Sequence, residues 1–320
     1  MNAVAACASR LSLLSKLTVA GVATLALSWL TTTVPSAQEA YVHLNPIIAR
    51  LAEGQPFYGL ITSDFSLSRA RQAARARGVD FIYADMEHTP LDLPALHRFL
   101  LGMTDRAAII SKGNLQPNVA LLMRAAPEVE QTQWIVQQAL DMGLHGFIYS
   151  GVETAEQAKL AVSYMRYPAA RGSKYPEPAG KRGSGPGIAQ WVWGVSGEQF
   201  RRHADLWPLN PEGDLIAIVM VETVSGMENM DAIMSTPGVG AVFIGAAGDI
   251  SVSMGLPRSD PQVEQARQNV LAACKRHNVA CGITVTSGAD LVKRVKEGWK
   301  MIRTTEDVVV AGRTALGDKF

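Results

Sequence analysis

Residues 79–88 read "VDFIYADMEH", an apolar run that ends in ionisable side chains, and residues 91–103 follow as "LDLPALHRFLLGM". The first run lacks strict alternation of apolar and polar residues, which is typical of a parallel strand covered on both faces. The second run has the spacing of a helix with one apolar face. Together they predict a strand followed by a helix.

The same order recurs along the chain. Counting the run above, eight strand-then-helix units are predicted; the other strands lie at 57–62, 118–127, 144–151, 215–223, 240–245, 280–287 and 300–305. Helix starts are marked by the cap residues Ser66, Thr154 and Ser287. Eight such units in one domain predict an α/β fold of the (β/α)8 or TIM-barrel type.

One long segment interrupts this order. Residues 167–213, between the predicted fourth helix and fifth strand, are rich in Gly, Pro, Trp and Arg. Their tryptophans argue against disorder, so we expect an ordered insertion that closes over the barrel mouth or forms part of a subunit contact. Its Gly-rich part, 179–187, lacks P-loop spacing and follows no strand, so it is a weak nucleotide site. Arg182 within it is a candidate substrate or interface residue.

The N-terminus has the layout of a leader. Arg10 and Lys16 precede the apolar run 17–30, and a polar stretch with small residues comes next. This predicts a signal peptide over residues 1–37 and a single barrel domain over 38–320, located in the periplasm or secreted. An uncleaved membrane anchor is the alternative, although the run is short for a bilayer span of about 20 residues.

The charges are balanced, with 30 basic and 29 acidic residues. No global field favours nucleic acid or an anionic membrane, so a small molecule is the expected partner.

Of the cysteines, Cys7 lies in the leader, while Cys274 and Cys281 lie in the mature chain. An oxidising compartment permits a disulfide between the latter two. Their expected positions, at a helix end and a strand start, leave two buried thiols equally open. Neither has the spacing partners of a zinc site.

Active sites of such barrels form at the carboxyl ends of the strands, here called the mouth. Polar residues that end the predicted strands are therefore candidates: Asp85, Glu87, His88, Arg124, Glu222 and Asp249. Glu222 and Asp249 end neighbouring strands and, with water and substrate oxygens, suit a divalent cation. The alternative is that each carboxylate serves as a helix N-terminal residue or a salt-bridge partner.

The other candidates suggest proton transfer and charge stabilisation. His88 beside Asp85 can act as a general base, directly or through metal-bound water, although a lone histidine is often structural. Arg124 can hold a carboxylate or stabilise an oxyanion, or can pair with a local acid. For Glu87 we expect a structural role, with a backbone amide as one partner.

These motifs resemble the HpcH/HpaI family of metal-dependent, pyruvate-type aldolases, in the phosphoenolpyruvate-binding group of barrels. The likeness runs from about residue 46 to 320. It is carried by "YADMEHTPLDLPAL" (83–96), "MRAAP" (123–127), "GKRGSG" (180–185) and "VMVETVSGMENMDAIMSTPGVGAVFIGAAGDISVSMG" (219–255).

The resemblance implies a role for each candidate. His88, with Asp85 as its partner, would serve proton transfer, and Arg124 would stabilise the pyruvate enolate. Glu222 and Asp249 would bind Mg²⁺, Mn²⁺ or Co²⁺. Members of the family assemble as homo-oligomers, often hexamers.

Substrate contacts are expected at Arg124 and, in the turn after the sixth strand, at Gly245, Ala247 and Gly248. This turn reads "GAAGDIS" where the family commonly has "GPADLS", so Asp249 follows an extra residue.

Two further departures concern the mouth. Residue 220 is methionine in place of glutamine, and the end of the fourth strand reads "YSGVE" (149–153) in place of an apolar proline turn.

We therefore predict a carbon–carbon lyase that reversibly cleaves a 4-hydroxy-2-keto acid to pyruvate and an aldehyde through a metal-bound enolate. One alternative is another lyase with the same metal–enolate chemistry, acting on a malyl- or oxaloacetate-like acid. The other is a non-catalytic periplasmic protein that binds an organic acid.

Overall fold

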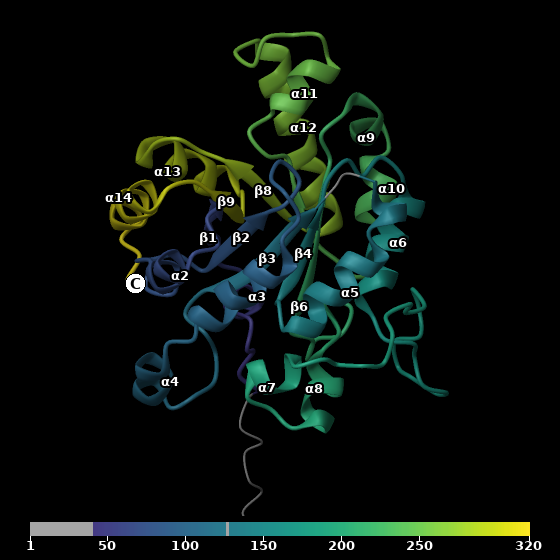
Figure 1. The fold of residues 1–320 in the computed structure, drawn as a ribbon. Coiled ribbons are helices and arrows are strands. Elements are labelled where there is room, and N and C mark those ends of the chain that lie inside the picture. The colour runs from purple at the N-terminus through teal and green to yellow at the C-terminus, as the bar shows by residue number, and fades with distance from the viewer. Residues whose placement is uncertain (1–40, 126–127) are drawn as a thin grey trace, which may run out of the picture. The chain divides into compact units, whose positions relative to one another are not determined.

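Parallel strands pair around a closed ring in the computed structural model, which describes residues 41–125 and 128–320. The order around the ring is β4, β3, β2, β1, β9, β8, β7 and β6, and β6 pairs back with β4. The ring strands are β1 (Phe57–Thr62), β2 (Phe81–Asp85), β3 (Ala120–Ala125), β4 (Gly146–Tyr149), β6 (Leu215–Met220), β7 (Val239–Phe243), β8 (Ala280–Thr284) and β9 (Met301–Arg303). The predicted barrel is confirmed, and every predicted apolar run supplies a strand (Figure 1).

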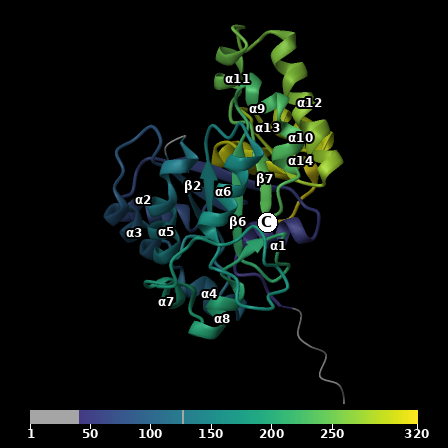
Figure 2. The ribbon, with the colours of Figure 1, turned by 90° about the vertical axis from the view of Figure 1, so that its right-hand side faces the viewer.

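Helices connect successive strands and lie around the outside of the ring (Figures 1 and 2). Those of the first half are α1 (Pro46–Ala52), α2 (Leu67–Ala73), α3 (Leu93–Gly102), α4 (Arg106–Lys112), the 3-10 turn η1 (Val129–Gln131), α5 (Gln133–Met142) and α6 (Ala155–Met165). Those after the insertion are α9 (Val224–Glu228), α10 (Met230–Met234), α11 (Gly248–Ser253), α12 (Pro261–His277), α13 (Gly288–Glu297) and α14 (Glu306–Leu316).

The predicted cap residues begin three of these helices. The side chain of Ser66 accepts a hydrogen bond from Arg69 N at 3.2 Å, and Ser287 accepts one from Asp290 N at 3.2 Å. Thr154 forms a reciprocal capping box with Gln157. Each cap satisfies a backbone N–H that has no partner within its helix. The cap thereby fixes the residue at which the loop after the preceding strand ends and the helix begins.

The inside of the ring is a packed apolar core, separate from the layer between the strands and the helices. Its buried members are Ile47, Phe57, Phe81, Tyr83, Ala120, Leu122, Ile148, Ile216, Ile218, Met220, Ala241, Phe243 and Met301. Within each strand these residues are two apart, because alternate side chains of a strand face the same side. This register decides which residues beyond the strand ends face the mouth.

The insertion at 167–213 is ordered, as predicted, and contains α7 (Ala189–Trp193), α8 (Gly197–His203) and the short strand β5 (Leu206–Trp207). Trp193 stacks on His145 with ring centroids 5.2 Å apart and donates a hydrogen bond to Gly143 O at 2.8 Å. Strand β5 pairs with the first residues of β6.

These contacts place the insertion at the amino ends of the strands, opposite α9 and α11 (Figure 1). The expectation that it closes over the mouth is therefore wrong. The physical reason is that a helix-to-strand connection lies at the amino end of a barrel, whereas strand-to-helix loops form the mouth. The alternative role in a subunit contact stays a prediction.

The cysteines of the mature chain are paired. A disulfide joins Cys274 near the end of α12 to Cys281 in β8, with Cα atoms 5.8 Å apart. Both residues are buried in the layer between strands and helices. The sequence left a disulfide and two buried free thiols equally open, and the structure contains the disulfide.

The predicted leader, residues 1–37, lies outside the described residues. From Tyr41 onward, apart from residues 126–127, the structure contains no helix of the length and apolarity that a membrane span requires.

Candidate active site

Strand register brings polar side chains together at the mouth. Tyr83, Leu122 and Met220 belong to the inner core, and the residues two positions further on are Asp85, Arg124 and Glu222. The alternation of side chains along a strand makes these polar residues face inward as well. Asp85 and Arg124 are also direct neighbours across β2 and β3.

Arg124 lies between two carboxylates. Its Nη2 is 2.9 Å from Asp85 Oδ1, its Nε donates to the same oxygen at 3.1 Å, and its Nη1 is 2.7 Å from Glu87 Oε2. The three side chains are at most 13% exposed. A guanidinium has five N–H donors, so these contacts leave others for a substrate. The group has a permanent positive charge in a fixed orientation.

Glu87 has a larger part in the site than the sequence indicated. Besides Arg124, its Oε2 accepts a hydrogen bond from Ser150 Oγ at 3.1 Å. The structural role stays a prediction, but the partners of the carboxylate are side chains, and among the described residues no backbone amide donates to it. Ser150 was not among the candidates. The signal that marks it is its place at the end of an apolar run, two residues after the inner-core residue Ile148.

His88 lies at the edge of this cluster. Its side chain is 68% exposed, and its Nε2 is 3.5 Å from Glu87 Oε2. Among the hydrogen bonds of the described residues none joins His88 to Asp85, because Asp85 is bonded to Arg124 instead. The structure thus brings His88 to Glu87, and the predicted roles of His88 and Asp85 in proton transfer stay predictions.

Glu222 is a buried carboxylate without a cationic partner among the described residues. Its Oε2 accepts one hydrogen bond, from Gly151 N at 3.3 Å. Burial, followed by the negative charge of Asp249, raises the pKa of Glu222 to about 7. Glu222 is buried and Asp249 is exposed, so a negative charge without a cationic partner lies buried beside a second, exposed one. A bound cation would relieve the repulsion between them.

Asp249 does not end a strand as expected; its exposed side chain has the helix N-terminal position that was the alternative, and its role as a metal ligand stays a prediction. It lies in the first turn of α11, after β7, because the turn beginning at Gly245 extends the chain by several residues before the helix starts. Its negative charge is the second cause, after burial, that raises the pKa of Glu222.

The turn before Asp249 contains two residues in a left-handed backbone conformation. Gly245 and Ala247 have φ of 57° and 56°, a left-handed conformation that costs little for glycine. A Cβ at Gly245 would lie 3.6 Å from Glu222 Oε1, so its absence keeps the space beside that oxygen open. At Gly248 a Cβ would meet Arg258 Nη2 at 2.6 Å. Whether these residues bind substrate stays a prediction.

The oxygen donors of the two carboxylates are of the chemical kind that a hard divalent cation prefers. In residues 41–125 and 128–320, no cluster of three or more His, Cys, Asp or Glu side chains could hold a metal ion. Mg²⁺ usually keeps several waters and binds through one or two carboxylates together with substrate oxygens. Glu222 and Asp249 can provide such a pair.

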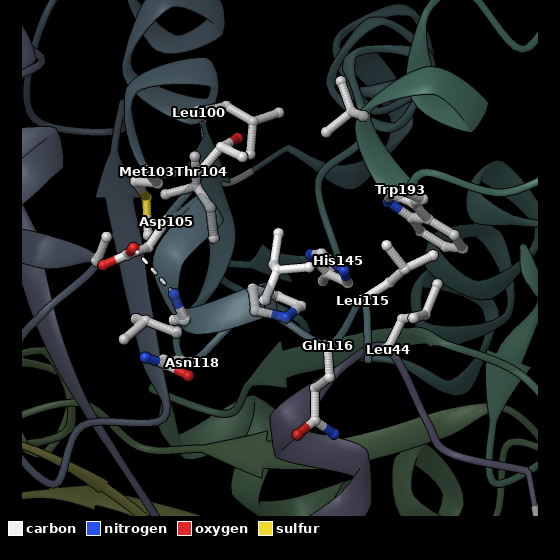
Figure 3. Close-up of a pocket in the computed structure, with 17 residues that line it drawn as sticks. Leu44, Leu100, Met103, Thr104, Asp105, Leu115, Gln116, Asn118, His145 and Trp193 are labelled. Carbon is white, nitrogen blue, oxygen red and sulfur yellow. Dashed lines mark hydrogen bonds between the residues drawn. The ribbon is translucent and has the colours of Figure 1, made fainter. Parts of the chain in front are cut away.

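A separate cavity lies away from the mouth. Its volume is about 70 Å³, and its walls include Leu44, Val119, His145 and Trp193, near the amino ends of β3 and β4 (Figure 3). Burial lowers the pKa of His145 to about 4, so its imidazole is neutral near pH 7. None of the predicted site residues lines this cavity, so the chemistry is assigned to the mouth.

Comparison with known proteins gives a consistent family. A family model described as "HpcH/HpaI aldolase/citrate lyase" matches residues 66–313. A hydroxypyruvate/pyruvate aldolase of Cupriavidus necator is 30% identical over 278 residues, which is 85% of this chain and 90% of the relative. A 5-keto-4-deoxy-D-glucarate aldolase of Salmonella arizonae is 29% identical over 247 residues, or 76% of this chain and 84% of the relative.

A solved structure shows the same likeness. An HpcH/HpaI aldolase/citrate lyase family protein from Burkholderia cenocepacia superposes with a TM-score of 0.66 at 30% identity. The match covers 85% of this chain and 98% of that protein.

Proposed function

The chain belongs to the HpcH/HpaI aldolase/citrate lyase family and is a carbon–carbon lyase of the aldolase type, and from this we propose its reaction. It reversibly cleaves a 4-hydroxy-2-keto acid to pyruvate and an aldehyde, with an enolate of pyruvate as the intermediate. The observation that supports this most is the carboxylates of Glu222 and Asp249, which pair with no cation among the described residues, at a mouth that also holds Arg124.

Glu222 and Asp249 would hold the divalent cation, Mg²⁺, Mn²⁺ or Co²⁺, which when bound supplies Lewis acidity toward the keto oxygen and carboxylate of pyruvate. Arg124 provides fixed positive charge where negative charge develops on the enolate oxygen. Asp85 and Glu87 hold the guanidinium in place from two sides, so little reorganisation is needed during the reaction.

His88 is the proposed group for proton transfer. Its imidazole is exposed at the mouth, next to the carboxylate of Glu87. In the cleavage direction it removes the proton of the 4-hydroxyl through a water molecule, and in synthesis it returns that proton. Asp85 is proposed to support this step, as the resemblance implies.

The test of the reaction is pyruvate release from a panel of 4-hydroxy-2-keto acids by the purified mature protein. We expect activity with added Mg²⁺, Mn²⁺ or Co²⁺ and loss of activity after a chelator, restored by adding the cation again. Oxaloacetate decarboxylation is measured in parallel, because any site that stabilises an enolate can show it. Decarboxylation of oxaloacetate without any aldol cleavage would favour the alternative lyase. Aldol cleavage that survives exhaustive metal removal would contradict the proposed metal dependence.

We also propose that residues 1–37 are a signal peptide. The Cys274–Cys281 disulfide supports this, because disulfides persist in oxidising compartments. Expression of the full chain in a Gram-negative host should give a periplasmic protein whose mass corresponds to cleavage near residue 37. A chain that starts at residue 38 is the control and should stay in the cytoplasm. Full-length protein in the membrane fraction would instead indicate an anchor.

A further inference from the structure

Two polar side chains end β8 and β9 on the inner side of the ring. Met301 belongs to the inner core, and Arg303 is two residues further along β9. Ala280 packs against the same core, and Thr284 is four residues further along β8. Thr284 and Arg303 are direct neighbours in the pairing of the two strands. Both side chains therefore face the mouth side by side.

Each side chain has one buried polar atom that no described protein atom satisfies, although the guanidinium of Arg303 also hydrogen-bonds to Tyr83. Arg303 Nε and Thr284 Oγ1 are buried without a hydrogen-bond partner. Within residues 41–125 and 128–320, no carboxylate pairs with Arg303, whereas Arg124 has both Asp85 and Glu87. Buried donors left without partners are rare, and each destabilises the protein unless water or a ligand satisfies it.

The ring order places this pair away from the proposed reaction centre but in the same mouth. Around the ring, β9 lies directly opposite β4, four strands away in either direction. It lies three strands from β3, which contains Arg124, and three strands from β6, which is followed by Glu222. Tyr83 contacts both arginines, Arg124 with its ring and Arg303 through a side-chain hydrogen bond. Its ring is 5.6 Å from Arg124 Cζ, and the charges of Arg303 and Arg124 both oppose the rise in its pKa that burial causes.

We propose that Arg303 and Thr284 bind a second anionic group, a carboxylate or a phosphate, on the aldehyde half of the substrate. This inference rests on the proposed function, because the second anionic group would belong to the substrate of the proposed reaction. That substrate would reach across the mouth from the enolate end, near Arg124, to Arg303. A guanidinium fork matches the oxygens of a carboxylate or phosphate, and the threonine hydroxyl adds one donor. The substrates are then 4-hydroxy-2-keto acids with a charged far end.

The kinetic test compares two substrates that differ mainly at that end. 4-Hydroxy-2-oxoglutarate has a carboxylate where 4-hydroxy-2-oxopentanoate has a methyl group, and a phosphorylated 4-hydroxy-2-keto acid forms a third arm. The wild type should prefer one of the anionic substrates, which also identifies the anion. Arg303→Gln should lower kcat/KM for that substrate about 10- to 100-fold and leave the methyl substrate nearly unchanged. The loss should appear mainly in KM, because the contact exists before and during the reaction.

Two further variants separate charge from packing. Arg303→Lys keeps the charge without the fork and should retain part of the preference. Arg98→Gln, at an exposed position on α3, is the matched control and should behave as wild type. If Arg303→Gln lowered activity equally on both substrates, Arg303 would be a packing residue and the inference would be overturned.

A binding measurement keeps the inference testable without turnover. Calorimetry compares 2-oxoglutarate with 2-oxopentanoate, which have the same chain length and differ in the distal charge, and inorganic phosphate is added as a competitor. Tighter binding of 2-oxoglutarate by wild type, or displacement by phosphate, should vanish in Arg303→Gln. If wild type bound 2-oxoglutarate more tightly but cleaved no aldol substrate, only the proposed reaction would be contradicted. If both acids bound equally and phosphate had no effect, the anion site would be overturned.

Discussion

Replacing Glu222 with glutamine is expected to lower metal-dependent pyruvate release by at least about 100-fold. Glutamine keeps the shape of the side chain and can still accept the hydrogen bond from Gly151 N, so the surrounding backbone is preserved. It removes the negative charge that a divalent cation requires. Titration of Mn²⁺ into the two proteins should show a corresponding loss of affinity in the variant.

The same substitution should not destabilise the metal-free protein near neutral pH, and this separates a ligand from a structural residue. The pKa of Glu222 is raised from 4.5 to about 7, so the folded state holds this proton more tightly than the unfolded state. The stability that comes from the protonated group is present below pH 4.5 and is lost as the pH rises through 7. Wild type should therefore lose up to roughly 3 kcal/mol relative to the variant over that interval.

Thermal melts at pH 5 and pH 8, with and without Mn²⁺, measure this difference. Added Mn²⁺ should recover the stability of wild type at pH 8 and leave the Glu222→Gln variant unchanged. Glu228→Gln, at an exposed position of α9, is the control for loss of one carboxylate. If wild type and Glu222→Gln released pyruvate equally and bound Mn²⁺ with equal affinity, the proposed role of Glu222 as a metal ligand would be wrong.

The barrel and the inward-facing candidates could be predicted from the sequence because both depend on short-range patterns. Apolar runs gave the strands, and the residue that closes each run is set by the alternation of side chains. Asp85, Arg124 and Glu222 were found in this way, and all three are at the mouth. Arg303 follows the same rule, but it was not among the candidates because it lies inside the predicted run 300–305 and does not close it.

The partners of these residues could not be predicted, because they depend on how strands pair. Asp85 and His88 are close in sequence, yet Asp85 faces Arg124 across β2 and β3 while His88 has left the strand. The position of Asp249 depended on the conformation of the turn at Gly245–Ala247, which two left-handed residues set. Such contacts are fixed by tertiary structure and leave no periodic signal in the sequence.

Replacing Arg124 is expected to affect both stability and activity, and the two effects can be separated. Arg124→Ala leaves the buried carboxylates of Asp85 and Glu87 without their shared cation. Breaking a buried ion pair by removing one partner costs about 3–5 kcal/mol. The variant should therefore melt at a clearly lower temperature, and pyruvate release should fall by about 100-fold or more, as when an oxyanion-stabilising donor is removed.

A triple variant distinguishes the two roles of the guanidinium. Arg124→Met combined with Asp85→Asn and Glu87→Gln removes all three charges and fills the space with groups of similar volume, which is often neutral for stability when a buried ion network is replaced. Its melting temperature should return toward that of wild type, whereas its activity should stay low because no positive charge faces the enolate oxygen. The companion Asp85→Asn, Glu87→Gln variant, which keeps Arg124, shows how much activity the two carboxylates contribute on their own. If the triple variant regained both stability and more activity than this companion, Arg124 would serve the fold alone, and the charge that stabilises the enolate would have to come from elsewhere in the mouth.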